Sequence, residues 1–270
     1  MALLRRTASG VLLAALVVAA ALLGGPPLLA LASLALVIGL AEFRRLGTSL
    51  GAAPPWWLMG PLAGLWLLRA AIPGGAATEI GLGLALVPGL PCALLWSRGA
   101  RPFAPWATAV GGALWLGYGL GFLVLLARAP GAGQVGGWLV LLVVGVAVVS
   151  DTAAYLVGSA VGRRPFFPAI SPRKTVEGAL AGLAAAVVLV AWVLPLLRPS
   201  VPVAAAGLCG VLAGVASQAG DLVESTLKRA AGVKDAGGWI PGHGGLLDRL
   251  DSVVLVGPAV YSVLRALHAL

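Results

Sequence analysis

Long apolar stretches, interrupted only by short polar segments, constrain this chain more than any other feature. A helix needs about 20 mostly apolar residues to cross a hydrocarbon layer roughly 30 Å thick. Inside lipid the backbone must satisfy its own hydrogen bonds, which selects helices, and uniformly apolar stretches lack the alternation of a membrane β-barrel. The sequence therefore predicts an all-α fold, a polytopic integral membrane helical bundle with about nine transmembrane helices. The stretches run approximately from Val11 to Leu23, Leu28 to Phe43, Trp56 to Ile72, Ile80 to Trp96, Pro105 to Ala127, Trp138 to Val157, Val176 to Leu197, Pro202 to Ala219 and Val253 to Leu270.

The composition excludes an ordinary soluble domain, because 60% of the residues are hydrophobic and only 10% are charged. Soluble domains carry roughly 25% charged residues. The formal net charge of +9 would suggest a nucleic-acid partner for a soluble protein. Here the basic residues lie in short loops between apolar stretches, as in membrane proteins with a positive inner face. We therefore expect a lipid bilayer as the surroundings and no nucleic acid.

The basic residues also predict an orientation. The N-terminal segment resembles a signal peptide, but a second apolar stretch follows at once, which favours an uncleaved span. With the N-terminus in the cytoplasm, all but four of the 18 lysines and arginines fall on the inner side. We expect a multi-pass protein of the cell inner (plasma) membrane with its active site facing the cytoplasm. It forms a single transmembrane domain over 1–270, with N-terminal spans in 1–130 and site-bearing spans in 131–270.

The acidic residues mark where chemistry is expected, because seven of the nine lie between positions 151 and 251. On the predicted topology all seven lie at or near the inner face. A carboxylate facing lipid is costly, so those at span ends should face a polar cavity. The seven are Asp151, Glu177, Asp221, Glu224, Asp235, Asp248 and Asp251.

The segment from Asp221 to Ser252 is the richest in charge. Asp221, Ser225 and Lys228 are spaced i, i+4, i+7 and share one helix face. We expect Gly232 to end this helix. A glycine-rich loop follows, including Gly244 and Gly245, whose backbone amides can approach an anion closely. Helix should resume near Leu246, which puts Asp248 and Asp251 one turn apart.

This combination of charges suits a metal–phosphate ligand. Carboxylates bind a divalent metal, whereas lysine, arginine and backbone amides bind phosphate oxygens. Oxygen ligands favour magnesium over zinc. A solvated loop with salt bridges is the alternative, and a second polar segment on the same side argues against it.

That second segment runs from Ser150 to Gly178. Asp151 and Tyr155 lie one turn apart near the end of a span. Lys174 can reach a phosphate and Thr175 can cap the next helix, with Glu177 close by. Four bases form a surface between the spans, although two of them equally suit the role of inside-anchoring charges. The four are Arg163, Arg164, Arg173 and Lys174, and the two are Arg163 and Arg164.

The C-terminal half resembles the phosphatidate cytidylyltransferases, also called CDP-diacylglycerol synthases. The resemblance rests on the residues from Ser225 to Arg229, Lys234 with Asp235, Pro241 to Gly245, and Asp248 to Asp251, at the family's long fixed spacings. Asp151 to Tyr155 and Ile170 to Gly178, which contains Ser171, Lys174, Thr175 and Glu177, also resemble the family. Ala153 and Ala236 depart from its usual residues, and neither side chain carries chemistry.

The resemblance implies an activity and its cofactors. The family converts phosphatidate and CTP to CDP-diacylglycerol and pyrophosphate with magnesium, and potassium is suggested as a second ion. Metal ligands are implied at Asp221 and Asp248. Among the residues matching the family, we expect Asp151, Tyr155, Ser171, Lys174, Thr175, Glu177, Ser225, Gly244 and Gly245 to bind substrate. A homodimer stays open as the assembly.

The chemistry of phosphate suggests roles for the remaining candidate residues. A phosphate monoester is largely dianionic at neutral pH, since its second pKa is about 6, so it can attack without a general base. His243 is then either a base, a phosphate donor or a residue that shapes the loop. Asp235 and Asp251 either orient the basic residues or complete the metal's ligand set. Four residues are expected to neutralise phosphate charge: Lys228, Arg229, Lys234 and Arg249.

Two other functions remain open from the sequence. A CTP-dependent polyprenol or phytol kinase would use the same nucleotide but would have to activate a neutral hydroxyl. A membrane ion transporter would use the carboxylates as an ion pathway. The absence of an inverted repeat and the concentration of charge at one face argue against the transporter.

Overall fold

The structure is a computed structural model that describes residues 2–72, 103–129, 135–239 and 244–270. Apart from isolated bridge residues, such as the pair Pro165 and Thr175, all regular structure in these residues is helical. The predicted all-α fold is confirmed. The helices are α1 (Ala2–Leu23), α2 (Gly25–Ser49), α3 (Trp56–Ala71), α5 (Phe103–Gly112), the π-helix η1 (Ala113–Tyr118), α6 (Gly119–Ala127), α7 (Val135–Val161), α8 (Val176–Leu197), α9 (Val203–Ala230), α10 (Leu247–Leu250) and α11 (Val253–Ala266).

Five helical segments within the described residues are long and apolar enough to cross a membrane. They are α2, the continuous α5–η1–α6 segment, α7, α8 and α9. The apolar part of α1, Ser9–Leu23, is shorter, and so are α3 and α11. The predicted stretch from Ile80 to Trp96 lies outside the described residues. The chain is therefore a helical membrane protein, and the number of nine spans stays a prediction.

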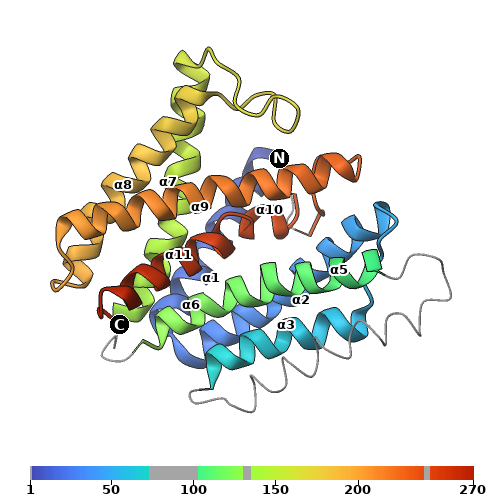
Figure 1. The fold of residues 1–270 in the computed structure, drawn as a ribbon, viewed down its shortest axis with the longest axis horizontal. Coiled ribbons are helices and arrows are strands. Elements are labelled where there is room, and N and C mark those ends of the chain that lie inside the picture. Colours follow the sequence, from blue (N-terminus) through green and yellow to red (C-terminus); the bar gives the residue numbers. More distant parts are fainter. Residues whose placement is uncertain (1, 73–102, 130–134, 240–243) are drawn as a thin grey trace.

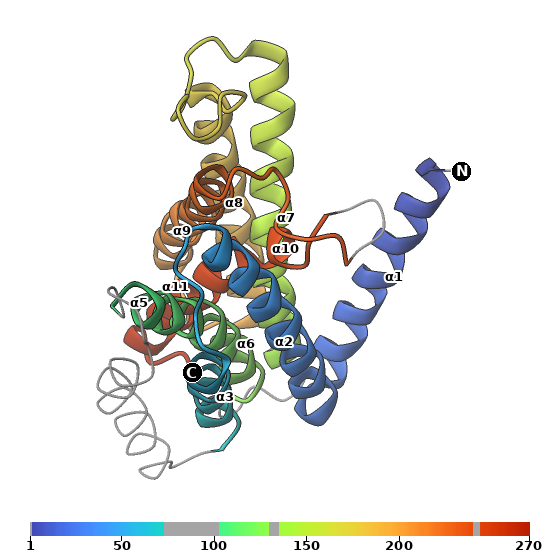
Figure 2. The same cartoon turned by 90° about the vertical axis from the view of Figure 1, so that its right-hand side faces the viewer.

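The helices form two groups joined by α9 and α11 (Figure 1). Helices α2, α3, α5 and α6 lie side by side, whereas α7 and α8 pack against each other and project away from them. Helix α9 packs on α8 and on α11, and α11 packs on α6. Figure 2 shows the same order from the side, with α9 and α11 between the α7–α8 pair and α6. The start of α11 and the part of α9 around Gly220 that packs on it therefore lie in the middle of the molecule.

The first two helices form a hairpin at their short glycine–proline connection. The chain reverses at Gly24, whose φ of 62° favours glycine. Helix α1 packs against α2 and also against α7. The N-terminal hairpin thus contacts both groups of helices.

The close approach of α9 to the start of α11 depends on Gly220. A β-carbon at this position would clash with the carbonyl oxygen of Asp251. Small residues let helix backbones approach in this way within membrane proteins. Ser252 strengthens the contact because its hydroxyl donates to the Ser217 carbonyl at 3.0 Å. This packing brings Asp221 on α9 and Asp251 before α11 into one region.

Candidate functional site

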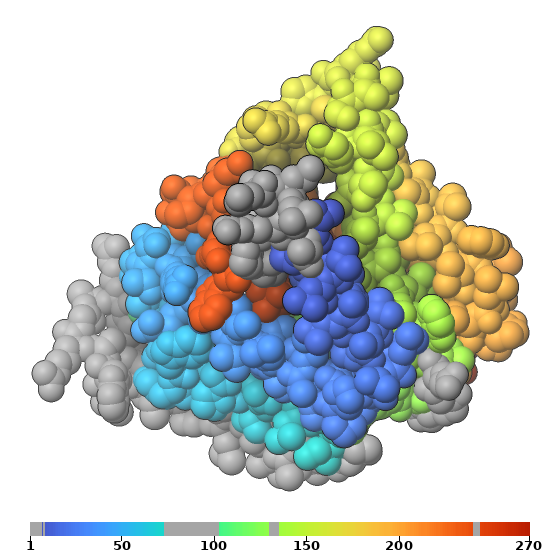
Figure 3. All heavy atoms as spheres, turned by 180° about the vertical axis from the view of Figure 1, so that it is seen from behind, coloured from blue at the N-terminus to red at the C-terminus, as the bar shows by residue number. Residues whose placement is uncertain are grey.

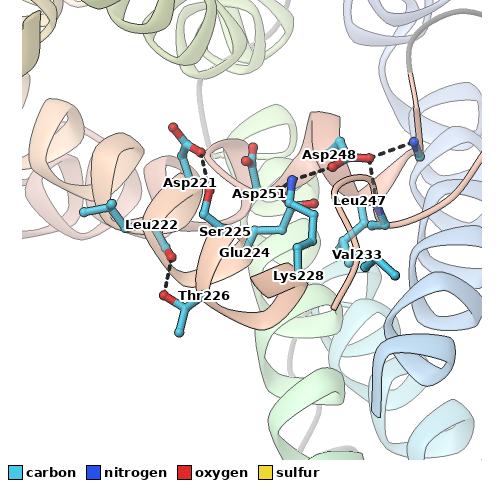
Figure 4. A network of polar contacts seen from close by, with 12 residues as sticks. Asp221, Leu222, Glu224, Ser225, Thr226, Lys228, Val233, Leu247, Asp248 and Asp251 are labelled. Carbon is cyan, nitrogen blue, oxygen red and sulfur yellow. Dashed lines mark hydrogen bonds and ion pairs between the residues drawn. The ribbon is translucent and has the colours of Figure 1, made fainter. Parts of the chain in front are cut away.

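The last two turns of α9 present a polar face toward α10 and α11 (Figure 4). Asp221, Ser225 and Lys228 share this face, as the spacing predicts. The Ser225 hydroxyl donates to Oδ1 of Asp221 at 3.3 Å. Helix α9 ends at Ala230, and Gly232 follows with a φ of 71°, so the predicted helix end is confirmed.

Lys228 connects α9 to α10 through two carboxylates. Its ammonium contacts Glu224 one turn earlier and Oδ1 of Asp248 at 2.5 Å. The side chain of Lys228 is 12% exposed, Glu224 is 1% exposed and Asp248 is 10% exposed. Charges this buried are tolerated when they are paired and hydrogen-bonded. One lysine therefore serves as the counter-ion of two carboxylates from different parts of the chain.

Asp248 is oriented by the backbone as well as by Lys228. Its Oδ2 accepts hydrogen bonds from the amide of Gly245 at 2.8 Å and from the amide of Ala236 at 3.1 Å. Burial raises the pKa of Asp248, but the hydrogen bonds from Lys228 and Gly245 outweigh burial and leave that pKa below its ordinary value. The side chain is therefore an ionised carboxylate at neutral pH. The amide of Gly245, which was predicted to bind an anion of the substrate, here binds a carboxylate of the protein itself.

The second polar segment meets the first at Asp221. The ammonium of Lys174, in the loop between α7 and α8, forms an ion pair with Oδ2 of Asp221. The loop is ordered by the bridge between Pro165 and Thr175. Thr175 caps α8 by accepting the amide of Gly178 at 3.2 Å, so its predicted capping role is confirmed. Two polar segments that are 47 residues apart at this contact thus belong to one site.

Glu177 lies at the base of the same loop. Its Oε2 accepts the amides of Arg163 at 3.1 Å and Arg164 at 3.2 Å. This carboxylate therefore fixes the exit of α7, and the side chains of both arginines are exposed. Glu177 contributes to the shape of the loop that carries Lys174.

Asp251 is a further carboxylate near Asp221. It is 8% exposed, and its Oδ1 accepts the amide of Ser252 at 2.6 Å. Burial and the negative charges of Asp221 and Asp151 hold the pKa of Asp251 above its ordinary value, against the opposing effect of the Ser252 amide. The negative charges of Asp151 on α7 and Asp221 on α9 therefore act on Asp251 in the turn before α11.

The predicted metal ligands fit magnesium by their chemistry without forming a closed ligand set. Within the part of the chain that the structure describes, no group of three or more His, Cys, Asp or Glu side chains gathers closely enough to bind a metal. Asp221 and Asp248 are each paired with a lysine instead. Their carboxylate oxygens are nevertheless the donors that magnesium prefers. The metal assignment of Asp221, Asp248 and Asp251 remains a prediction.

The other predicted residues lie around this cluster. The Nη1 of Arg229 donates to the Val233 carbonyl at 3.1 Å and thereby links the last turn of α9 to the loop that follows it, a contact that the sequence interpretation as a phosphate ligand did not foresee. Arg249 lies within electrostatic range of Asp151. Tyr155 is 74% exposed. Lys234 and Asp235 lie on the exposed loop after α9, Gly244 lies beside Asp235, and Ser171 forms part of a turn before Lys174. His243 lies outside the described residues.

One polar contact was missed entirely from the sequence. Glu42 of α2 is fully buried and accepts the amide of Leu247, at the start of α10, at 2.7 Å. Its position at the end of an apolar stretch, away from the other acidic residues, was the only signal available.

Comparisons with known proteins find relatives of one family. The sequence profile described as "Cytidylyltransferase family" matches residues 4–267. The phosphatidate cytidylyltransferase of Bacillus subtilis (strain 168) is 44% identical over 115 residues, 43% of this chain and 43% of that protein. The phosphatidate cytidylyltransferase of Synechocystis sp. (strain ATCC 27184 / PCC 6803 / Kazusa) is 49% identical over 115 residues, 42% of this chain and 38% of that protein. Uncharacterized protein YnbB of Escherichia coli (strain K12) is 41% identical over 132 residues, 49% and 44% of the two chains. The matched regions span less than half the length of each of these relatives.

Proposed function

The chain belongs to the cytidylyltransferase family, and we propose that it transfers the cytidylyl group of CTP to phosphatidate, giving CDP-diacylglycerol and pyrophosphate. The observation that carries this proposal is the charge cluster in which Lys174 meets Asp221 and Lys228 meets Asp248. It joins the two segments that resemble the phosphatidate cytidylyltransferases. Relatives that bear this name support the same reaction.

The reaction brings two polyanions together, so the site must neutralise phosphate charge. The phosphatidate phosphate forms a bond to the α-phosphorus of CTP, while the bond from this phosphorus to the bridging oxygen breaks and pyrophosphate leaves with the electron pair. The attacking phosphate is already largely dianionic, since its second pKa is about 6. No side chain has to remove a proton, and a base role for His243 is unnecessary.

Two lysines are well placed to bind phosphate oxygens. Lys174 is 31% exposed and Lys228 is 12% exposed, and each now contacts a carboxylate. Each would exchange this carboxylate, wholly or in part, for a phosphate oxygen when substrate enters. Asp248 keeps its orientation through the Gly245 and Ala236 amides during such an exchange.

Magnesium, with potassium as a further expected ion, would be held by Asp221 and Asp248, with Asp251 nearby, and would supply positive charge to the phosphates. Arg249 and Lys234 would add to the positive field around the nucleotide. Asp151 faces the same region, because its charge acts on Asp251. Its role is to balance the lysine charge while the site is empty of substrate.

The site also has to reach a lipid. The loop between α7 and α8 carries exposed bases beside Lys174, and a basic surface at the headgroup level would attract an anionic lipid. We place this face on the cytoplasmic side of the cell inner membrane, because most lysines and arginines fall there on the predicted topology. The polyprenol kinase and transporter alternatives gain no support from the comparisons.

The decisive experiment is product identification. Purified protein in detergent is incubated with labelled CTP, phosphatidate and magnesium, and the lipid and soluble products are separated and analysed by mass spectrometry. We expect CDP-diacylglycerol and pyrophosphate in equal amounts. Production of CDP with a newly phosphorylated lipid would instead identify a kinase. Omitting phosphatidate gives the control.

A further inference from the structure

Glu42 connects the N-terminal helices to the turn that carries Asp248. It lies near the C-terminal end of α2 and is fully buried. Its Oε2 accepts the amide of Leu247 at 2.7 Å across a separation of 205 residues. In Figure 3 the loop after α9 lies against the N-terminal helices in this region of the molecule. The contact is thus a direct polar link between α2 and the first turn of α10.

The glycine-rich loop closes around this carboxylate. A β-carbon at Gly237 would clash with Oε1 of Glu42, and one at Gly245 would lie 2.7 Å from Oε2 and 2.7 Å from the Gly237 nitrogen. Both positions therefore require glycine while Glu42 occupies this place. Two segments of the loop meet at the carboxylate. This contact explains the glycines at the two positions without a bound phosphate.

The same short segment orients Asp248. Glu42 binds the amide of Leu247, while Asp248 binds the amides of Gly245 and Ala236. Ala236 directly precedes Gly237, so both ends of the loop are held by carboxylates. Without Glu42, the backbone at Leu247 and the neighbouring Gly245 would be free to move. Asp248 would then lose the orientation in which it contacts Lys228.

The free-energy cost of burying a carboxylate indicates that Glu42 does more than fill space. A buried carboxylate carries a high desolvation cost, and Oε1 of Glu42 has no hydrogen-bond partner among the described residues. A leucine or methionine would fill the same volume at lower cost. What an apolar residue lacks is an acceptor for the Leu247 amide.

We propose that Glu42 is a positioning residue for the reaction, which holds the glycine-rich loop and the start of α10 so that Asp248 faces Lys228 and the substrates. Its catalytic consequence rests on the proposed function. Its structural part, the protection of the Leu247 amide, does not. Glu42 acts through Asp248 and touches no reacting atom.

The test uses Glu42→Ala, Glu42→Gln and a control, Met59→Ala. Met59 is fully buried on α3, and its truncation removes a similar volume from the interior without touching the loop. Hydrogen exchange of the peptide covering residues 244–252 is measured in detergent without substrate. We expect faster exchange in Glu42→Ala, near-normal exchange in Glu42→Gln, whose amide oxygen can still accept, and normal exchange in Met59→Ala.

Kinetics provide the second readout. A small displacement of a reacting geometry can cost about 100-fold in rate, so we expect Glu42→Ala to lose about 100-fold in kcat and to need more magnesium for half-maximal activity. Glu42→Gln should recover to within about tenfold of the wild type, because it restores the acceptor. Met59→Ala should keep the kcat and magnesium dependence of the wild type per folded molecule.

The inference is overturned if Glu42→Ala matches Met59→Ala in both exchange and magnesium dependence. If Glu42→Ala does not fold, Glu42→Asp replaces it, since the side chain is one methylene too short to reach Leu247, and unchanged exchange and kcat in this variant equally refute the idea. A wild-type protein that makes no CDP-diacylglycerol refutes the proposed function, whereas the exchange result still decides the role of Glu42.

Discussion

The helices before residue 130 and the helices after residue 134 bury different kinds of side chain. Among the described residues before position 130, the only buried charged or polar side chain is that of Glu42. The described residues after position 134 bury five such side chains: Ser150, Ser217, Glu224, Asp251 and Ser252. The N-terminal helices are held together by apolar contacts such as those of Met59, Leu62 and Leu116.

This difference indicates that the N-terminal helices support the fold and that the C-terminal helices carry the candidate site. In the N-terminal helices, replacing one apolar residue by another of similar volume costs little stability, because apolar contacts do not depend on the direction of particular bonds. The charged pairs of the C-terminal helices depend on named atoms at named distances. Glu42 is the exception, because this N-terminal carboxylate accepts a hydrogen bond from the start of α10.

The largest expected effect is that of Asp248→Asn. The variant weakens the contact with Lys228 and removes an anionic ligand, so CTP incorporation into lipid should fall about 100-fold or more. Thr226→Ala is the matched control, because Thr226 points away from Asp221 on the same helix and bonds only to the Leu222 carbonyl (Figure 4). Activity of Asp248→Asn close to that of the control would remove Asp248 from the metal role.

Lys228→Met should combine lost activity with lost stability. It leaves Glu224 and Asp248 buried without their shared counter-ion, and removing one partner of a buried pair costs about 3–5 kcal/mol. The thermal unfolding midpoint in detergent should fall clearly. Adding Glu224→Gln should recover part of the stability and none of the activity, whereas an unchanged midpoint would show that the pairs carry no stability.

Lys174→Ala should act on substrate affinity. A hydrogen bond to a charged group contributes about 1.5–3 kcal/mol, so we expect the apparent KM for phosphatidate to rise about tenfold or more, with a smaller change in kcat. Arg163→Ala, in the same loop, is the comparison: it removes one exposed charge of the basic surface but no contact with the charge cluster, so the KM for phosphatidate should rise less. Equal behaviour of the two variants would return Lys174 to a role in topology.

Leu62→Ala probes the apolar group and should have the smallest effect on catalysis. Leu62 is fully buried on α3, and truncating such a residue costs about 2–5 kcal/mol. The unfolding midpoint should fall, while kcat per folded molecule and the magnesium dependence stay unchanged. A changed magnesium dependence would mean that the N-terminal packing reaches the site by a route other than Glu42.

Local features of the site were accessible from the sequence because they depend on short spacings. The shared face of Asp221, Ser225 and Lys228 follows from helix periodicity. The cap at Thr175 and the helix end before Gly232 follow from the backbone preferences of these residues. The bond from Arg229 to the Val233 carbonyl was not accessible from the sequence, because it depends on how the chain turns after α9.

The sequence by itself determined that this protein is an all-helical membrane protein with most of its acidic residues in two C-terminal segments, because apolarity and short-range spacing act within each helix. Only the tertiary structure decided which charges meet. Lys174 finds Asp221, Lys228 finds Asp248, and Glu42 finds Leu247 because the helices pack in one particular order. Electrostatic pairing depends on distance through space, and distance along the chain does not reveal it.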